Sequence, residues 1–461
     1  MNVLLCSTYE LGHQPLGLAS PAAALRAAGI RVECRDLAVE HLAEASVRNA
    51  DVVGISVPMH TAIRLGALLA AEVKAIQPSA HVCFYGLYAS LNGDYLLANG
   101  GDSVVGGEYE QGLVSLVRRL SGQPGDEQPG VRLAGWPAVQ PFLGRLRFPV
   151  PARDALPPLD RYAFLDLGGE RRAVGYVEAS RGCAHQCLHC PIPPVYGGRV
   201  RIVQEDVVLE DVAQLVAMGA RHIDFGDPDF LNGVRHSLRI VRRLRERFPD
   251  LTLNFTAKVE HLIEHEDVVR EMAGLGCLFI QTAVESLSDT VLRHLDKGHT
   301  EADVRRAVAI AASAGIVLRP TFVAFTPWTT LDDYLAMLDF IEEVGWIDNV
   351  APVQYTIRLL VPPGSSLLGR PQTEGMLGPL DEAQFTYEWR HPDRRMDELQ
   401  AAASALVEQA EAAGEDPRLT FYRLKSLAGS VARGRGAAFG PPSGAPTSAA
   451  TVPRLSEPWF C

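Results

Sequence analysis

The sequence has no long hydrophobic run and no secretory leader. No uncharged apolar run approaches the roughly 18 residues that a membrane-spanning helix requires, so we expect no membrane partner. The N-terminus has no basic segment and carries Glu10 soon after its apolar start, which argues against a signal peptide. These features predict a cytoplasmic protein.

Positive charge is also scarce, with 43 Lys and Arg against 55 Asp and Glu and a net charge of -12. Nucleic acids and anionic membranes are recognised through an excess of Lys and Arg, so neither is expected as a partner. A small-molecule substrate fits this charge better. The composition, 47% hydrophobic and 21% charged, is that of a globular protein, and 461 residues predict two or three domains.

A disulfide framework is not indicated, because the eight cysteines are scattered except for one close trio. Four of the others lie in or beside apolar, strand-like runs and are predicted to be small buried hydrophobic residues. These four are Cys6, Cys34, Cys83 and Cys277. The eighth cysteine, Cys461, ends the sequence and is considered separately.

Strand and helix patterns alternate along most of the chain, which predicts an α/β protein. The first alternating region is typical of a doubly wound, Rossmann-like parallel sheet with a ligand crevice at the strand carboxyl ends. After a linker rich in Pro, Gly and Arg, six further βα units predict a partial (β/α)6 TIM barrel with its chemistry at the strand C-termini. A helical extension and a low-complexity, disordered tail follow. The predicted boundaries are 1–120, 121–172, 173–369, 370–432 and 433–461.

The cysteine trio forms a CxxxCxxC motif directly after the first predicted barrel strand. Cys183, Cys187 and Cys190 can ligate three corners of a [4Fe-4S] cluster and leave the fourth iron open. S-adenosylmethionine (SAM) can bind that iron, so that an electron enters its sulfonium and breaks a carbon–sulfur bond. A zinc site is an alternative, but zinc usually takes four ligands in paired spacing and no matching pair follows.

The segment from Val177 to Gly369 resembles the radical SAM superfamily. The resemblance implies a [4Fe-4S] cluster, SAM and an electron donor such as flavodoxin or ferredoxin. It also implies SAM contacts from acidic residues, where Asp227 or Asp229 would meet the amino group. An ordinary Asp-Pro turn is the alternative for these two residues.

Two further SAM contacts follow from the same resemblance. The segment Ala283 to Ser286 is similar to the family's Gly-x-Glu-Ser sequence, whose glutamate lies near SAM, and this assigns Glu285. Lys258 ends the third barrel strand and is a candidate partner of the SAM carboxylate. A solvated lysine at the barrel rim is the alternative for Lys258.

The N-terminal region resembles the cobalamin-binding domain that is fused to many radical SAM enzymes. The resemblance rests on the sequence from His13 to Leu18, on Gly54-Ile55-Ser56 and on Val105 to Glu108. Some relatives bind cobalamin through a histidine that coordinates the cobalt. This resemblance makes His13 a candidate axial ligand, and a solvated loop histidine is the alternative. Cobalamin could also bind without a protein axial ligand, or the domain could serve only as a lid and docking surface.

The C-terminal sequence SEPWFC places two aromatic residues and a thiol at the end of the predicted disordered stretch. Trp459 and Phe460 could dock on the barrel. Alternatively, a mobile arm brings Cys461 to the active site as a catalytic thiol. The segments CLHCPIPPVYGGR, HIDFGDPDFLNG and EPWFC resemble a bacterial radical SAM family named for a Cys-Sec-Ala-Glu-Pro or Cys-Cys-Ala-Glu-Pro tail.

Together these features predict a transferase that cleaves SAM reductively and transfers a methyl or other SAM-derived group to a small molecule, with cobalamin as a candidate carrier. The layout is also similar to that of radical SAM enzymes of arsinothricin biosynthesis. Transfer of a 3-amino-3-carboxypropyl group to a soft element such as arsenic or selenium is therefore an alternative. A non-catalytic cobalamin or redox sensor is a second alternative.

The resemblance at the tail makes a prediction about the gene. In that family the cysteine is followed by selenocysteine, encoded by UGA, or by a second cysteine. We expect a UGA codon directly after the codon of Cys461, followed by codons for Ala-Glu-Pro. Sequencing the genomic DNA across this position tests the prediction. A UAA or UAG codon, or UGA without Ala-Glu-Pro beyond it, contradicts it.

Overall fold

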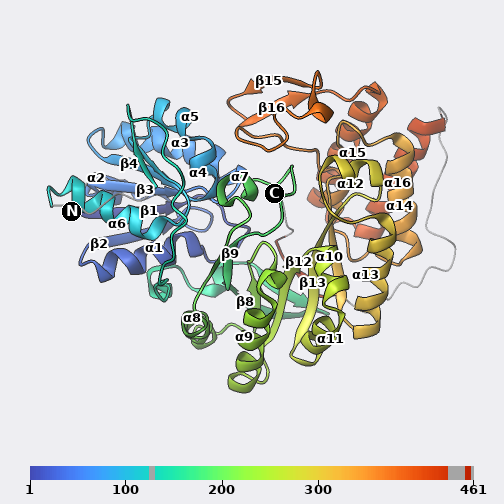
Figure 1. The fold of residues 1–461 in the computed structure, drawn as a ribbon, viewed down its shortest axis with the longest axis horizontal. Coiled ribbons are helices and arrows are strands. Elements are labelled where there is room, and N and C mark those ends of the chain that lie inside the picture. The colour runs from blue at the N-terminus through green and yellow to red at the C-terminus, as the bar shows by residue number, and fades with distance from the viewer. Residues whose placement is uncertain (124–129, 434–451, 458–461) are drawn as a thin grey trace.

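The computed structural model describes residues 1–123, 130–433 and 452–457. A Rossmann-like sheet lies on one side of the molecule, a curled half-barrel sheet lies beside it, and the C-terminal helices cover the far side (Figure 1). The predicted α/β class and the order of its parts are confirmed. None of the described helices is long and apolar enough to cross a membrane. Most of the predicted disordered tail, including Trp459, Phe460 and Cys461, lies outside the described residues.

The N-terminal sheet has the strand order β2-β1-β3-β4-β5-β6. Its first five strands are parallel and β6 is antiparallel. The strands are β1 (Asn2–Ser7), β2 (Arg31–Asp36), β3 (Val52–Ser56), β4 (His81–Tyr85), β5 (Ser103–Val105) and β6 (Val131–Leu133). The helices between them are α1 (Leu16–Ala27), α2 (Glu44–Arg48), α3 (His60–Ile76), α4 (Leu87–Leu91), α5 (Gly93–Ala98) and α6 (Tyr109–Leu120). Because the strand order reverses between β1 and β3, a ligand crevice is expected at their carboxyl ends.

Both faces of this sheet are covered, as expected of a parallel sheet. Along β1, Leu4 and Cys6 pack into the core on one face, whereas Val3 and Leu5 pack on the other. The prediction of buried cysteines is confirmed, since all four are at most 8% exposed: Cys6, Cys34, Cys83 and Cys277. The linker is more structured than predicted, because β6 adds an edge strand to this sheet.

The second sheet has the order β14-β13-β12-β11-β8-β7-β17 and curls into a half barrel (Figure 1). Its parallel strands are β8 (Glu170–Val177), β11 (His222–Phe225), β12 (Thr252–Ala257), β13 (Cys277–Glu285) and β14 (Val317–Phe322). The antiparallel edge strands are β7 (Phe164–Leu167) and β17 (Arg454–Leu455). The helices are α8 (Glu205–Ala217), α9 (Val234–Arg247), α10 (Val259–Glu264), α11 (Glu266–Gly274), α12 (Asp289–His294), α13 (Glu301–Ala314) and α14 (Leu331–Glu343).

The sixth predicted barrel strand is reduced. Its sequence forms the short 3-10 helix η4 (Pro352–Tyr355) and a single parallel bridge between Phe325 and Arg358. Pro352 lies at the first position of η4. A proline has no amide hydrogen to donate to a neighbouring strand, which disfavours a regular strand here. The half barrel therefore closes with a bridge in place of a full sixth strand.

The C-terminal extension contains a hairpin as well as the predicted helices. The hairpin is β15 (Leu377–Asp381) and β16 (Thr386–Trp389), and the helices are α15 (Arg394–Ala412) and α16 (Pro417–Arg433). Phe385 of the hairpin turn packs in the Rossmann core, 4.8 Å from the ring of Tyr95. The neighbouring Gln384 carbonyl lies 2.6 Å from Nε2 of His60. The hairpin thus joins the C-terminal extension to the N-terminal domain.

A buried arginine holds the linker against both sheets. Arg153 is fully buried, and its guanidinium donates two hydrogen bonds of 2.8 Å to the carboxylate of Asp211 in α8. It also donates to the carbonyl oxygens of Tyr176 in β8 and of Gln14 in the loop after β1. Because Arg153 and Asp211 are both buried, removing either side chain leaves the charge of the other uncompensated.

We predict that Asp211→Ala lowers the free energy of unfolding by about 3–5 kcal/mol, because Arg153 then stays buried without its counter-charge. Asp154→Ala is the matched control, since the Arg26–Asp154 pair is exposed and should contribute about 1 kcal/mol or less. Denaturant unfolding of both variants measures the difference. Equal losses in the two variants would contradict the assigned role of Arg153.

Candidate functional site

The cysteine motif lies on a loop between two short paired strands, β9 (Ser180–Gly182) and β10 (Val200–Ile202). Gly182 precedes Cys183 and has a φ of 76°. A Cβ atom there would lie 2.3 Å from the carbonyl oxygen of Arg199, so only glycine allows the two strands to approach. The short helix α7 (Ile192–Tyr196) follows the motif. The loop therefore leaves the sheet in a fixed direction.

The three cysteines carry free thiols and suit a metal cluster. Burial raises the pKa of Cys183, and burial together with the other two thiols raises the pKa of Cys190 to about 12. Asn232 Nδ2 donates to Cys183 Sγ over 3.6 Å, a contact that a thiolate accepts well. Thiols that are buried together favour the thiolate form only when positive charge is added, and iron ions would supply it. The donor set fits a [4Fe-4S] cluster.

One side of this loop contacts the end of β13. Glu285 has a φ of 64°, in the left-handed region that a side chain rarely adopts. Its Oε1 lies 3.4 Å from Lys297 Nζ and 3.6 Å from His189 Nε2 of the cysteine loop. Burial opposes ionisation of Glu285, but Lys297 and His189 together lower its pKa to about 2. A strained, ionised carboxylate beside the loop marks a functional position.

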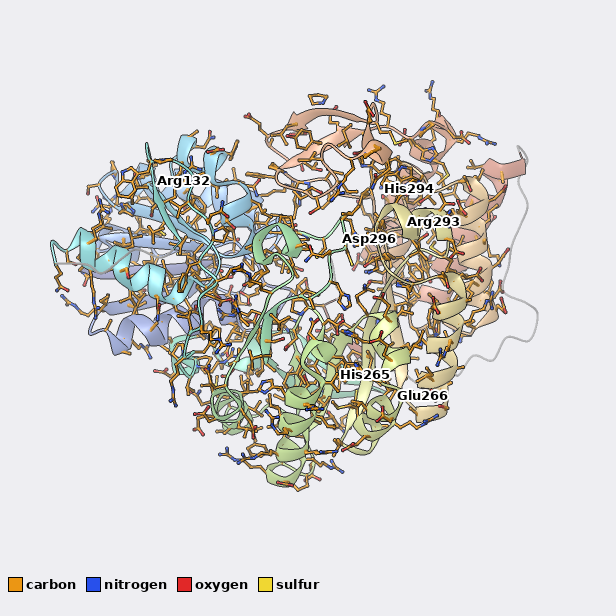
Figure 2. All side chains as sticks on the ribbon, in the orientation of Figure 1. Arg132, His265, Glu266, Arg293, His294 and Asp296 are labelled. Atoms are coloured by element: carbon orange, nitrogen blue, oxygen red, sulfur yellow. The ribbon has the colours of Figure 1, made fainter. Side chains whose placement is uncertain are left out.

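The turn after α12 holds the same side of the loop in place. The amide of Leu188 donates to the carbonyl of Leu295 over 2.9 Å. Asp296, labelled in Figure 2, has a φ of 52° and precedes the buried Lys297. Burial lowers the pKa of Lys297, but Glu285 and the thiols of the loop raise it, with a net increase. Lys297 therefore brings a positive charge next to the cysteines.

The other side of the loop contacts the ends of β11 and β12. Asp229 is fully buried, and its Oδ2 lies 3.4 Å from His185 Nε2 and 2.8 Å from His261 Nδ1. Burial opposes ionisation of Asp229, but the two imidazoles lower its pKa to about 2. Lys258 Nζ lies 3.3 Å from His185 Nδ1 and pairs with Glu260. Lys258 is 7% exposed, so the alternative of a solvated rim lysine is wrong.

Asp227 is held within the barrel. Its carboxylate accepts hydrogen bonds from the amide of Ala179 at 2.9 Å and from the hydroxyl of Ser180 at 2.5 Å. Burial raises its pKa to about 7. Asp227 therefore fixes the connection between β8 and β9, and a contact with the SAM amino group stays a prediction.

His13 lies at the boundary between the two sheets. Its Nε2 is 3.2 Å from Asp224 Oδ2 in β11, and its ring stacks on Tyr176 with 4.7 Å between centroids. The residue is 5% exposed, so the alternative of a solvated loop histidine is wrong. Its role as an axial ligand of cobalt is untested, and its imidazole is already engaged by the half barrel.

The carboxyl edge of the Rossmann sheet gathers buried polar oxygens. Within the described residues, four of them have no hydrogen-bond partner: Ser7 Oγ, Glu10 Oε2, Glu108 Oε1 and Glu110 Oε2. Burial raises the pKa of Glu10 to about 8, which favours its neutral form. Buried oxygens without partners favour a polar ligand at this edge. The amide groups around the corrin ring of cobalamin are suitable partners, so the residues fit this cofactor.

Arg181 joins this edge to the cysteine loop. Its guanidinium lies 3.0 Å from Glu108, 2.9 Å from Glu110 and 2.7 Å from Glu178. Glu108 and Glu110 follow β5 of the Rossmann sheet, whereas Arg181 lies two residues before Cys183. The candidate cluster site and the candidate cobalamin site are therefore connected by one buried side chain.

Comparison with known protein families identifies both regions. Residues 177–341 match the model of the radical SAM superfamily. This segment of the chain is a radical SAM domain. Residues 2–117 match the B12 binding domain, as the N-terminal motifs predict. The cofactors that these two families imply are a [4Fe-4S] cluster, SAM and cobalamin.

The fold of this chain is similar to those of two cobalamin-dependent enzymes of known structure. OxsB with aqua-cobalamin aligns with a TM-score of 0.71 and 16% identity over 89% of this chain and 67% of that one. TsrM of Kitasatospora setae, with tryptophan and a SAM analogue, aligns with a TM-score of 0.66 and 18% identity over 93% and 95%.

Two curated relatives are similar in sequence. The hopanoid C-3 methylase of Methylococcus capsulatus is 27% identical over 70% of this chain and 64% of its own length. An uncharacterized methyltransferase of Pyrococcus horikoshii is 25% identical over 56% and 51%. The chain therefore spans only about half to two thirds of these relatives.

The structure also brings together residues that the motifs did not assign. His185 and His189 stand inside the CxxxCxxC sequence, so their position was a usable signal. Lys297 lies in the turn after α12, and its contact with Glu285 indicates its role. Arg181 and His261 carry no sequence signal, because their partners are distant in the chain.

Proposed function

We propose that this protein is a cobalamin-dependent radical SAM methyltransferase that acts on a small molecule. The observation that carries the proposal is the contact of Arg181 with Glu108, which joins the cysteine loop to the ligand edge of the B12-binding domain. A methyl carrier and a SAM-cleaving cluster have to lie close to a shared substrate, and this contact supports such an arrangement. The substrate class rests on the negative net charge and on the relatives.

The residues have distinct roles in this proposal. Cys183, Cys187 and Cys190 would hold the cluster and leave one iron for SAM. Lys258 would bind the SAM carboxylate, and Glu285 would accept hydrogen bonds from SAM because it is ionised. When bound, the reduced cluster supplies an electron to SAM and cobalamin carries a methyl group. A flavodoxin or ferredoxin would supply the electron, and we propose a cytoplasmic location on this ground.

The relatives support methyl transfer above the alternatives. The curated relatives named above are a methylase and a methyltransferase, and TsrM is a methyltransferase. None of these names supports aminocarboxypropyl transfer to a soft element or a non-catalytic sensor. A catalytic thiol at Cys461 lies outside the described residues and stays a prediction. Nearby, Glu457 contacts the N-terminal domain through the hydroxyl of Tyr9 at 2.8 Å.

We expect protein purified without oxygen from cobalamin-fed cells to contain about four irons per chain and stoichiometric cobalamin. With SAM and a strong reductant it should release S-adenosylhomocysteine. SAM with a deuterated methyl group should label a small molecule in a metabolite extract. Metal analysis and mass spectrometry measure these outcomes.

Cys187→Ala should lose most of the iron and all SAM turnover, whereas Cys277→Ala, which removes a buried thiol far from the motif, should keep both. Protein that is fully loaded with iron and cobalamin and still does not consume SAM in the presence of such an extract would sink the proposed activity.

We further propose that cobalamin binds here without a histidine ligand to cobalt. The imidazole of His13 is held by Asp224 and Tyr176, and that of His60 lies against the Gln384 carbonyl. The EPR spectrum of the Co(II) form should therefore show no splitting from a protein nitrogen. His13→Ala and His60→Ala should leave that spectrum unchanged. A nitrogen splitting that disappears only in His13→Ala would overturn this proposal.

A further inference from the structure

Three side chains beside the cysteine loop have the arrangement of a metal site. One ligand atom each from His185, Asp229 and His261 lies within 4.8 Å of the other two. His185 comes from the cysteine loop, Asp229 follows β11 and His261 belongs to α10. The ring centroids of the two histidines are 4.7 Å apart. Two imidazoles and one carboxylate are a common ligand set of divalent first-row metals.

The two distances from the Asp229 carboxylate to the imidazole nitrogens agree with a shared ion. Metal–ligand bonds of about 2.0–2.1 Å separate neighbouring ligand atoms by about 3.3 Å in a tetrahedron and about 2.9 Å in an octahedron. The carboxylate oxygen of Asp229 lies 3.4 Å from one imidazole nitrogen and 2.8 Å from the other. Both nitrogens, His185 Nε2 and His261 Nδ1, are buried and make no hydrogen bond with any described residue. Each nitrogen faces the Asp229 carboxylate, and a cation would take the place of the proton between them.

Neighbouring residues also hold the ligand side chains in position. The amide of Leu231 donates to Asp229 Oδ1 over 3.0 Å and the amide of Lys258 donates to Oδ2 over 3.3 Å, so the carboxylate is fixed and Oδ2 keeps one lone pair for an ion. His185 Nδ1 lies 3.3 Å from Lys258 Nζ and 3.8 Å from the carboxylate of Glu260, so the ring is held on its far side as well. Lys258 adds a positive charge nearby, but Glu260 pairs with it. The carboxyl groups of Asp229 and Glu260 thus face a single ammonium group, that of Lys258.

We propose that His185, Asp229 and His261 bind a divalent first-row metal ion, such as Zn²⁺ or Fe²⁺, next to the cysteine loop. The ion ties the loop to the ends of β11 and β12. Three protein ligands leave at least one coordination position open to water or substrate. This site is separate from the three cysteines and does not depend on methyl transfer.

Zinc is the probe that tests the site in iron-loaded protein. Wild-type protein incubated with Zn²⁺ and desalted should keep about one zinc per chain with its iron unchanged. His261→Ala and Asp229→Asn should lose the zinc and keep the iron. His265, labelled in Figure 2, gives the matched control His265→Ala. It follows α10 one turn beyond His261, with 5.7 Å between the ring centroids, and lies outside the ligand set.

X-ray absorption at the zinc edge identifies the ligands. Nitrogen and oxygen neighbours at about 2.0–2.1 Å support the site, whereas sulfur at about 2.3 Å means that zinc has entered the cysteine loop and overturns it. Equal zinc in wild type and His261→Ala, or equal loss in His265→Ala, also overturns it. Thermal unfolding shows whether each variant is folded. Absence of SAM turnover with zinc bound would contradict the proposed function and leave the metal site standing.

Discussion

The arrangement of the two domains depends on a buried guanidinium shared by three carboxylates. Arg181 has only 7% of its surface exposed and carries one positive charge against Glu108, Glu110 and Glu178. Burial raises the pKa of Glu108 to about 7 although Arg181 opposes the rise, so a proton on this carboxyl reduces the excess negative charge at neutral pH. The guanidinium also lies over the ring of Tyr109. Removing it would leave buried carboxylates unpaired, which costs more than the pair itself contributes.

The position of the cysteine loop depends on the contacts of Arg181 and on the strand ends around the loop. Asp229 holds His185 on one side of the loop, and Glu285 approaches His189 on the other. The pKa of each carboxyl group is lowered to about 2, so both are ionised at neutral pH. The left-handed backbone of Glu285 costs about 1–3 kcal/mol. A position that retains such a cost is expected where a side chain has to point in one direction for function.

The sequence was sufficient for the cores and for the motif, because both depend on local patterns. Alternating apolar residues predict the two sheets, and one loop supplies Cys183, Cys187 and Cys190. Contacts between segments that are distant in the chain leave no such local pattern in the sequence. The pairing of β17 with β7 joins Arg454 to Asp166, and the contact of Phe385 with the Rossmann core follows a turn inside a region predicted as helical. The burial of His13 could not be predicted either, since Asp224 lies in the other domain.

These distant contacts bear on whether the N-terminal domain is only a lid. Gln384 contacts His60 across 324 residues, and Glu457 contacts Tyr9 across 448 residues. Each contact holds a C-terminal segment against the N-terminal domain. Both contacts reach segments at the ligand edge of the sheet, near the unpaired oxygens of Ser7 and Glu10. These two contacts therefore hold C-terminal segments at the edge where a cofactor would bind. This favours an N-terminal domain that still binds a cofactor.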